Sequence, residues 1–86
     1  MTLKLFTQPN CSKCPTAHAL VHQLTVNSEQ LIVEEYNVTT ADGLAEASFY
    51  SVMATPSLVL LDDSGKEIHT WRAETPSLTE INALLR

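Results

Sequence analysis

Residues 3–24, LKLFTQPNCSKCPTAHALVHQL, decide how this chain folds. Leu3–Phe6 is a short apolar run, which is typical of a buried strand. Gln8-Pro9-Asn10 ends it, because proline and asparagine favour turns. Beyond the turn, apolar side chains recur at the spacing of one helix face: Ala17, Leu20, Val21 and Leu24. The stretch therefore predicts a strand, a turn and a helix, and we expect the helix to end at Asn27 and Ser28.

Three further strands are predicted outside this stretch. Leu31–Val38 opens fully apolar and then alternates, and Leu58–Leu61 is apolar throughout. The polar residues 62–65, Asp-Asp-Ser-Gly, are typical of a hairpin turn. We therefore expect Lys66–Arg72 to return antiparallel to the strand before it.

Two more helices are predicted. Thr39 and Thr40 can cap the first of them, with Asp42 in its first turn and an inward face of Leu44, Ala47 and Tyr50 or Ser51. Gly43 weakens this helix by about 1 kcal/mol relative to alanine. Residues 77–80, Ser-Leu-Thr-Glu, form a capping box that opens the last helix, whose inward side chains are Leu78, Ile81, Leu84 and Leu85.

The predicted order is β-α-β-α-β-β-α, in one domain that spans residues 1–86. The first two strands must pair in parallel through a right-handed crossover, whereas the last two form a hairpin in the same sheet. Because the strands are nearly all apolar, we expect helices on both faces of a mixed four-stranded sheet. The fold class is therefore α/β.

Composition and charge exclude several classes of function. Hydrophobic residues make up 44% of the chain and charged residues 17%, which indicates a globular domain rather than a disordered segment. The net charge is −5, and the five basic residues are scattered, so we expect neither nucleic acid nor an anionic membrane as a partner. Apolar runs are too short for a membrane helix, and Met1–Thr7 does not resemble a signal peptide. We therefore expect a cytoplasmic protein.

Cys11-Ser12-Lys13-Cys14 lies where the first strand has ended and the first helix begins. A bond between cysteines this close constrains the unfolded chain very little, so chemistry explains the pair better than stapling does. The unpaired N–H groups and the dipole at a helix N-terminus both favour a thiolate over a thiol. We assign Ser12 and Lys13, which lie between the cysteines, as supporting residues of the site. Lys13 favours the thiolate by its positive charge if its side chain points toward the sulfur.

The helical periodicity distinguishes the two cysteines. Extended back at about 100° per residue, it puts Cys14 about 70° and Cys11 about 130° from the centre of the apolar face. Cys14 is therefore predicted to be the more buried of the two. We assign Cys11 as the attacking thiolate and Cys14 as the resolving thiol of a dithiol–disulfide exchange.

Two other functions are compatible with the same cysteines. His18 and His22 follow on the helix, but Cys11 and His22 would be about 16 Å apart at about 1.5 Å per residue. Zinc ligands must lie within about 4 Å of one another, so these four residues cannot hold one ion, and we assign no metal and no cofactor. We expect the histidines on a solvated helix flank. The cysteines alone could supply half of a zinc or iron–sulfur site shared by a dimer, and a redox-inert interaction domain is the third alternative.

The chain resembles the thioredoxin superfamily. The resemblance rests on the first strand, on the CxxC motif and on two later stretches, Ala54–Leu61 and Asp63–Glu67. It implies a thioredoxin-like fold, a cis peptide bond at Pro56, and a Thr55 backbone that pairs with a bound substrate chain like an added strand. It also implies exchange with disulfides of protein partners. The sequence does not name the electron donor, which we expect to be an unidentified reductase or glutathione. We expect a monomer.

The sequence departs from the pattern of thioredoxins at several places. Asn10 precedes the first cysteine instead of tryptophan, and Ser12-Lys13 replaces Gly-Pro. Leu5 stands where thioredoxins hold a buried acid, so another proton acceptor such as water must serve. Residues 72–75, Arg-Ala-Glu-Thr, lack the usual glycine, which we expect to narrow the substrate groove. Among the aromatic residues, we expect Trp71 to pack on the sheet or a helix, and Phe6, Phe49 and Tyr50 to lie in the core or at its edge.

Overall fold

The computed structural model describes residues 1–27 and 30–85, which form four strands and three helices. The element order matches the prediction, and the elements are β1 (Thr2–Thr7), α1 (Cys14–Asn27), β2 (Ile32–Asn37), α2 (Ala41–Phe49), β3 (Ser57–Leu61), β4 (Glu67–Trp71) and α3 (Leu78–Leu85). Helix α1 ends at Asn27 as predicted, while Ser28 lies outside the described residues. Its start differs, because α1 begins at Cys14 and leaves Cys11 in the turn before it.

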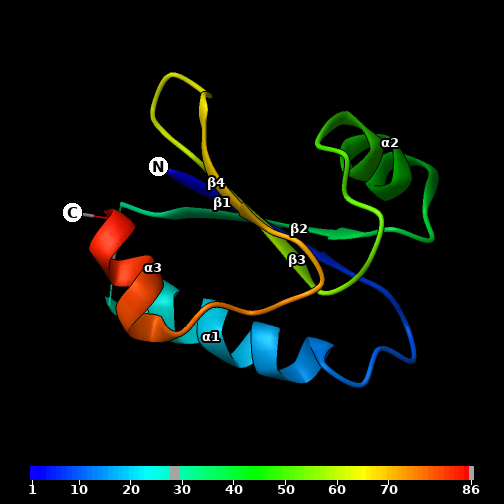
Figure 1. Ribbon diagram of the computed structural model, residues 1–86, viewed down its shortest axis with the longest axis horizontal. Helices are drawn as coiled ribbons and strands as arrows, with labels where there is room; N and C mark the ends of the chain where they lie inside the picture. Colours follow the sequence, from blue (N-terminus) through cyan, green and yellow to red (C-terminus); the bar gives the residue numbers. More distant parts are fainter. Residues whose placement is uncertain (28–29, 86) are drawn as a thin grey trace.

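The four strands form one mixed sheet in the order β2-β1-β3-β4. Strand β1 lies in the middle, parallel to β2 and antiparallel to β3, and β4 returns along β3 as the predicted hairpin. Figure 1 shows α1 and α3 together on one face of this sheet and α2 on the other. The prediction of a mixed sheet with helices on both faces is therefore confirmed.

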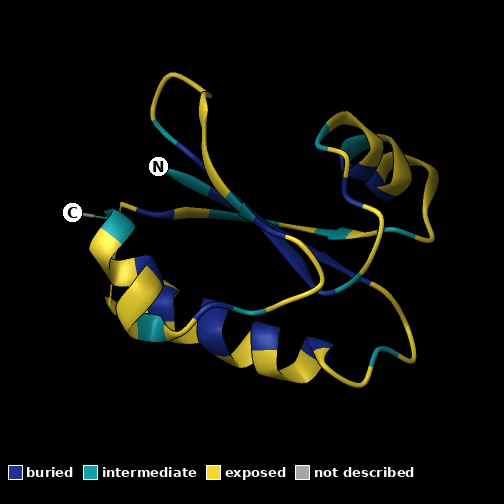
Figure 2. Ribbon diagram, viewed as in Figure 1, coloured by how far each residue is buried: buried dark blue, intermediate teal, exposed yellow. Residues whose placement is uncertain are grey.

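Two apolar cores fill the space between the sheet and the helices. The larger joins the sheet to α1 and α3 and includes Leu3, Leu5, Leu20, Leu24, Leu58, Trp71 and Ile81. The smaller joins it to α2 and is built on Phe6, Ala47, Val52, Val59 and Leu61. Figure 2 shows the buried positions along the sheet-facing side of α1. Neighbouring residues of a strand face opposite sides of a sheet, which explains why Leu5 and Phe6 belong to different cores.

Helix α2 sits on the sheet through its two smallest inward residues. Thr40 caps it as predicted, since its side chain accepts the N–H of Gly43 at 3.0 Å. Gly43 and Ala47 are buried, whereas Leu44 is 57% exposed, so its predicted inward position is wrong. Phe49 is 78% exposed, and its predicted place at the core edge is also wrong. The physical reason is that the glycine lets the helix approach the sheet closely, which turns its contact face toward Gly43 and Ala47.

Lys4 ties α2 to the sheet on the same side. Its ammonium lies 2.8 Å from a carboxylate oxygen of Glu46 on α2 and 3.2 Å from one of Glu34 on β2. The same ammonium lies 5.3 Å from the ring centroid of Tyr36 and 5.4 Å from that of Tyr50. Burial opposes the charge, but the hydrogen bonds to the two carboxylates outweigh it and raise the pKa of Lys4. The position of α2 over β1 and β2 is therefore fixed by charge as well as by packing.

Helix α3 covers the last part of the larger core. The N–H of Glu80 donates to Ser77 Oγ at 3.1 Å, which confirms one half of the predicted capping box. The Glu80 carboxylate instead accepts the indole N–H of Trp71 at 2.9 Å, so Trp71 packs between sheet and helix as expected. Ile81 is fully buried, and the remaining inward residues are partly buried against the core: Leu78, Leu84 and Leu85. Within residues 1–27 and 30–85, no helix combines the length and the apolar character needed to cross a membrane.

Candidate active site

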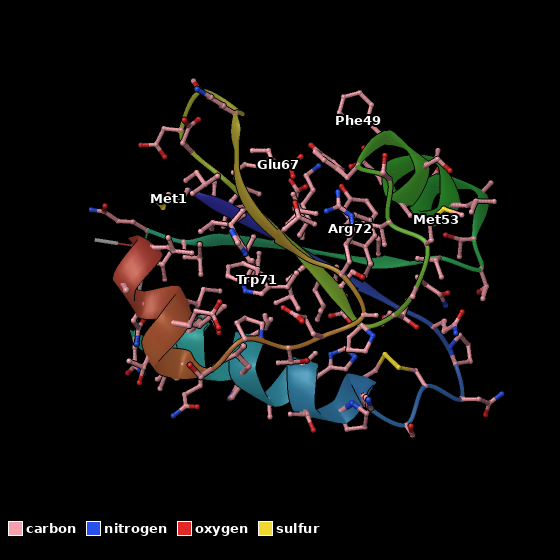
Figure 3. The ribbon with its side chains drawn as sticks, viewed as in Figure 1. Met1, Phe49, Met53, Glu67, Trp71 and Arg72 are labelled. Carbon is pink, nitrogen blue, oxygen red and sulfur yellow. A yellow bond between two sulfur atoms is a disulfide. The ribbon has the colours of Figure 1, made fainter. Side chains whose placement is uncertain are left out.

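Cys11 and Cys14 are joined by a disulfide at the N-terminal end of α1, where Figure 3 shows the bond between their sulfur atoms. Their Cα atoms are 5.4 Å apart. The N–H of Cys14 donates to the Cys11 carbonyl at 3.4 Å, which closes the turn between them. The backbone therefore holds the two sulfurs within bonding reach, as a reversible dithiol–disulfide pair requires.

The two cysteines differ in burial. Cys14 is only 5% exposed, while Cys11 is partly exposed, so the predicted order of burial is confirmed. In the first turn of α1, all of it within the described range 1–27, no residue is acidic, and nothing there offsets the positive end of the helix dipole. A partner molecule can therefore approach Cys11, and a thiolate at this end of the helix is favoured.

A shallow groove surrounds Cys11. Its lining comes from three segments: the turn from Gln8 to Lys13, Thr55 before β3, and Ala73 after β4. Ser12 and Lys13 are both exposed on its rim. The structure thus brings together the predicted residues Cys11, Ser12, Lys13 and Thr55, although they come from separate parts of the sequence.

Thr55 and Pro56 are joined by a cis peptide bond, as the resemblance implied. Pro56 is buried, and Thr55 faces the groove beside Cys11. The hydroxyl oxygen of Thr55 is buried and has no hydrogen-bond partner among the described residues.

Two residues that position the groove were missed by the sequence analysis. Ser57 is fully buried; its hydroxyl donates to the Ala54 carbonyl at 2.6 Å and accepts the N–H of Ala73 at 3.1 Å. Arg72 donates to the carbonyls of Tyr50 and Ser51. A serine at the start of an otherwise apolar strand was a signal for the first. The second contact joins residues 21 and 22 positions apart, which no local pattern reveals.

The departures from the thioredoxin pattern have structural counterparts. Leu5 is fully buried in the larger core, so the place of the buried acid is apolar in this chain. Ala73 lies in the loop where the usual glycine is missing. It adopts a left-handed backbone with φ of 59° and lines the groove. Phe49, on the exposed side of α2, does not line the groove that the described residues form around Cys11.

The histidines lie on the solvated flank of α1, as predicted. His18 and His22 are exposed, and the Nε2 atom of His18 lies 3.2 Å from a carboxylate oxygen of Glu35 on β2. In the part of the chain that the structure describes, no three side chains of the histidine, cysteine, aspartate or glutamate type are grouped as a metal site.

Comparison with known proteins finds one consistent set of relatives. A family model described as a thioredoxin domain matches residues 1–86. A probable thioredoxin of Archaeoglobus fulgidus is 35% identical over 60 residues, a match that covers 70% of this chain and 65% of the relative. A thioredoxin of Methanocaldococcus jannaschii is 30% identical over 61 residues, covering 71% of each chain. The match thus spans slightly less than two thirds of the length of the first relative.

Solved structures of thioredoxins share the fold. Thioredoxin 1 of Thermosipho africanus superposes with a TM-score of 0.80 at 20% identity, covering 99% of this chain and 90% of its own. Thioredoxin O2 of Arabidopsis thaliana, in its oxidized state, gives a TM-score of 0.80 at 12% identity, covering 98% of this chain and 70% of its own. The predicted thioredoxin-like α/β fold is confirmed by these superpositions.

Proposed function

The chain belongs to the thioredoxin-domain family, and on this premise we propose that it is a dithiol–disulfide oxidoreductase that exchanges disulfides with protein partners. The observation that carries the proposal is the Cys11–Cys14 pair itself, with one sulfur accessible and the other buried at the start of a helix. Cys11 lines the groove, where a partner can reach it, and Cys14 is buried. The established family relationship supports the reaction type, and the burial of each sulfur supports the individual roles.

The reaction proceeds in two exchanges. In the reduced protein, the Cys11 thiolate attacks one sulfur of a partner disulfide, forms a mixed disulfide and releases the other partner sulfur as a thiolate. Cys14 then loses its proton and attacks the Cys11 sulfur, which forms the internal disulfide and releases the second partner sulfur. The partner disulfide gains two electrons and two protons, and the protein dithiol loses them. An unidentified reductase or glutathione then returns the protein to the dithiol.

The surroundings of Cys11 favour these steps. The N-terminus of α1 stabilises the thiolate electrostatically, and the exposed Lys13 adds positive charge at the groove rim. An extended partner segment lies along the Thr55 backbone next to the buried Pro56 and presents its disulfide to Cys11. Since Leu5 provides no acid, water accepts the proton of Cys14.

The proposal includes the setting in which the protein acts. It takes residues 1–86 as one monomeric domain that works in the cytoplasm and binds neither nucleic acid nor membranes. The net charge of −5 with scattered basic residues supports the last point. A reduction potential of about −270 mV, measured in glutathione buffers, would fit a cytoplasmic reductase, whereas one of about −120 mV would indicate an oxidant.

Disulfide reduction assays on cysteine variants test the proposal. The wild type, with dithiothreitol as electron donor, is expected to reduce the disulfides of insulin. Cys11→Ser is expected to abolish turnover, while Cys14→Ser traps a mixed disulfide that is visible by mass spectrometry. Thr79→Ala, an exposed position on α3 that does not line the groove, serves as the control and is expected to keep the activity of the wild type. Full activity in Cys11→Ser would contradict the attacking role, and a Cys14→Ser variant that traps nothing would contradict the resolving role.

A further inference from the structure

The end of α2 is built as a tight backbone turn. Ser51 follows the helix in the left-handed region, with φ of 57°. Its N–H donates to the Ser48 carbonyl at 3.1 Å, and the N–H of Val52 donates to the Ala47 carbonyl at 2.7 Å. This pair of bonds is the usual way to close a helix with a left-handed residue, although glycine normally fills that place. The turn sets the direction in which the chain leaves α2 toward Thr55.

Arg72 holds this turn from the end of β4. Its Nε atom donates to the Ser51 carbonyl at 3.2 Å, and its Nη2 atom donates to the Tyr50 carbonyl at 2.9 Å. Figure 3 shows Arg72 reaching toward the segment that follows α2. The last turn of α2, which lies within the described residues, contains no basic residue, so Arg72 supplies the cation that the negative end of a helix favours. The planar guanidinium can satisfy both carbonyls at once.

The same short stretch after β4 holds the other end of the segment. The Ser57 hydroxyl connects the Ala54 carbonyl to the N–H of Ala73, next to Arg72. Residues 50–54 are therefore fixed at both ends to residues 72–73, at the first end by Arg72 and at the second by Ser57.

The segment held in this way forms one wall of an apolar hollow. The hollow is lined by Leu44 and Ala47 of α2 and by Val52, Met53 and Thr55 of the segment after it. It is continuous with the groove around Cys11, because Gln8 and Thr55 line both. Met53 is 93% exposed and Leu44 is 57% exposed, so the hollow offers accessible apolar surface next to the groove that Cys11 lines.

We propose that Arg72 is a positioning residue for substrate binding: it fixes residues 50–55 so that the hollow accepts an apolar side chain from the extended segment that flanks a partner disulfide. The inference rests on the proposed function and names the class of substrate that this site prefers. Arg72 lines neither the hollow nor the groove around Cys11, and it acts through the backbone of Tyr50 and Ser51. The guanidinium limits the movement of the wall before the substrate arrives, which lowers the ordering cost of binding.

Steady-state kinetics with three disulfides test the inference. The first is a peptide disulfide with leucine two residues from its cysteine, the second has serine at that place, and the third is bis(2-hydroxyethyl) disulfide. Arg72→Ala is expected to raise KM for the leucine peptide roughly threefold to tenfold, as loss of a charge-assisted hydrogen bond does, with kcat within about twofold. The other two substrates and the reduction potential of the cysteines are expected to stay unchanged.

Three further variants separate positioning from general stability. Arg72→Lys keeps the charge but cannot donate to two carbonyls in the geometry of a guanidinium. It is therefore expected to raise KM for the leucine peptide nearly as much as Arg72→Ala does. Lys66→Ala removes an exposed positive charge on the β3–β4 hairpin and is expected to behave as the wild type. Met53→Ser makes the hollow polar without touching Arg72, and should raise the same KM.

The outcomes distinguish the inference from the proposed function. An unchanged KM for the leucine peptide in Arg72→Ala, with an active wild type, overturns the inference alone. An equal rise in KM for all three disulfides also overturns it, because a loss of general structure would act in that way. A wild type that reduces none of the three contradicts the proposed function, and the inference with it.

Discussion

Replacing Gly43 with alanine should destabilise the protein, although helix propensity predicts the opposite. Alanine in a helix interior is favoured over glycine by about 1 kcal/mol, so the sequence alone indicates a gain from Gly43→Ala. The structure reverses the sign. A Cβ atom built on Gly43 would lie 1.9 Å from the Asn37 carbonyl oxygen and 2.6 Å from its carbon.

The size of the loss follows from what the new methyl group meets. Both close atoms belong to the backbone at the end of β2, and that carbonyl already accepts hydrogen bonds from the N–H and the hydroxyl of Thr40. Neither backbone atom can move without breaking these hydrogen bonds, so α2 must move outward by about 1.5 Å to restore an ordinary van der Waals contact. Overpacking of this kind costs about 1–3 kcal/mol, and loss of the Thr40 cap adds about 1 kcal/mol. After subtraction of the propensity gain of about 1 kcal/mol, the net loss is about 1–3 kcal/mol.

Urea unfolding of the oxidised protein, followed by the fluorescence of Trp71, measures the change. Gly65→Ala is the matched control, since a Cβ there meets no described atom within 4 Å, and only the φ of +88° disfavours alanine. That variant should lose about 1–2 kcal/mol, the cost of placing an L-residue in the left-handed region. A Gly43→Ala variant as stable as the wild type, or more stable, would refute the close approach of α2 to Asn37.

Three further outcomes follow from single residues of the site and the sheet. Ala73→Gly should stabilise the protein by about 0.5–1 kcal/mol in urea unfolding, because glycine adopts the φ of 59° without steric cost; a loss of stability would contradict this. Thr55→Val should also stabilise it, by about 1 kcal/mol, since it removes a buried hydroxyl that lacks a partner among the described residues. Hydrogen bonds from Tyr36 and then Lys4 lower the pKa of Glu34 below its usual 4.5, so the stability that this carboxylate contributes is present above that pH and is lost as the pH falls through the folded-state pKa. Unfolding free energies measured from about pH 6 down to pH 3 should therefore fall less steeply in Glu34→Gln than in the wild type, and equal slopes would contradict the assignment.

Most of the fold could be predicted because each element carries a strong local pattern. The apolar spacing of Ala17, Leu20, Val21 and Leu24 survives unchanged in the buried face of α1. Strand β3, apolar except for Ser57, is buried along its whole length, as a strand covered by helices on both sides requires. The observed strand ends differ from the predicted ones by about one residue, because hydrogen bonding rather than hydrophobicity decides where a strand stops.

The orientation of α2 could not be predicted from the same kind of pattern. Periodicity marks large apolar residues, and it therefore selected Leu44 as an inward side chain. The helix instead faces the sheet through Gly43, a residue that periodicity ignores and whose small size matters only once Asn37 stands opposite. The contacts of Arg72 were hidden for a related reason, because they join carbonyl groups that every residue possesses.

The groove is stiffer than its loops suggest. Each of the three segments around it carries a left-handed residue that is not glycine: Asn10 before Cys11, Ser51 after α2 and Ala73 after β4, with φ of 65°, 57° and 59°. Such conformations persist only where the surrounding structure enforces them, and they cluster at binding and reaction sites. Here Arg72 holds the carbonyl of Ser51, and Ser57 holds the N–H of Ala73. The chain thus uses long-range hydrogen bonds in places where glycine would have allowed movement, and a groove fixed in this way can align a partner disulfide with Cys11 at little cost in entropy.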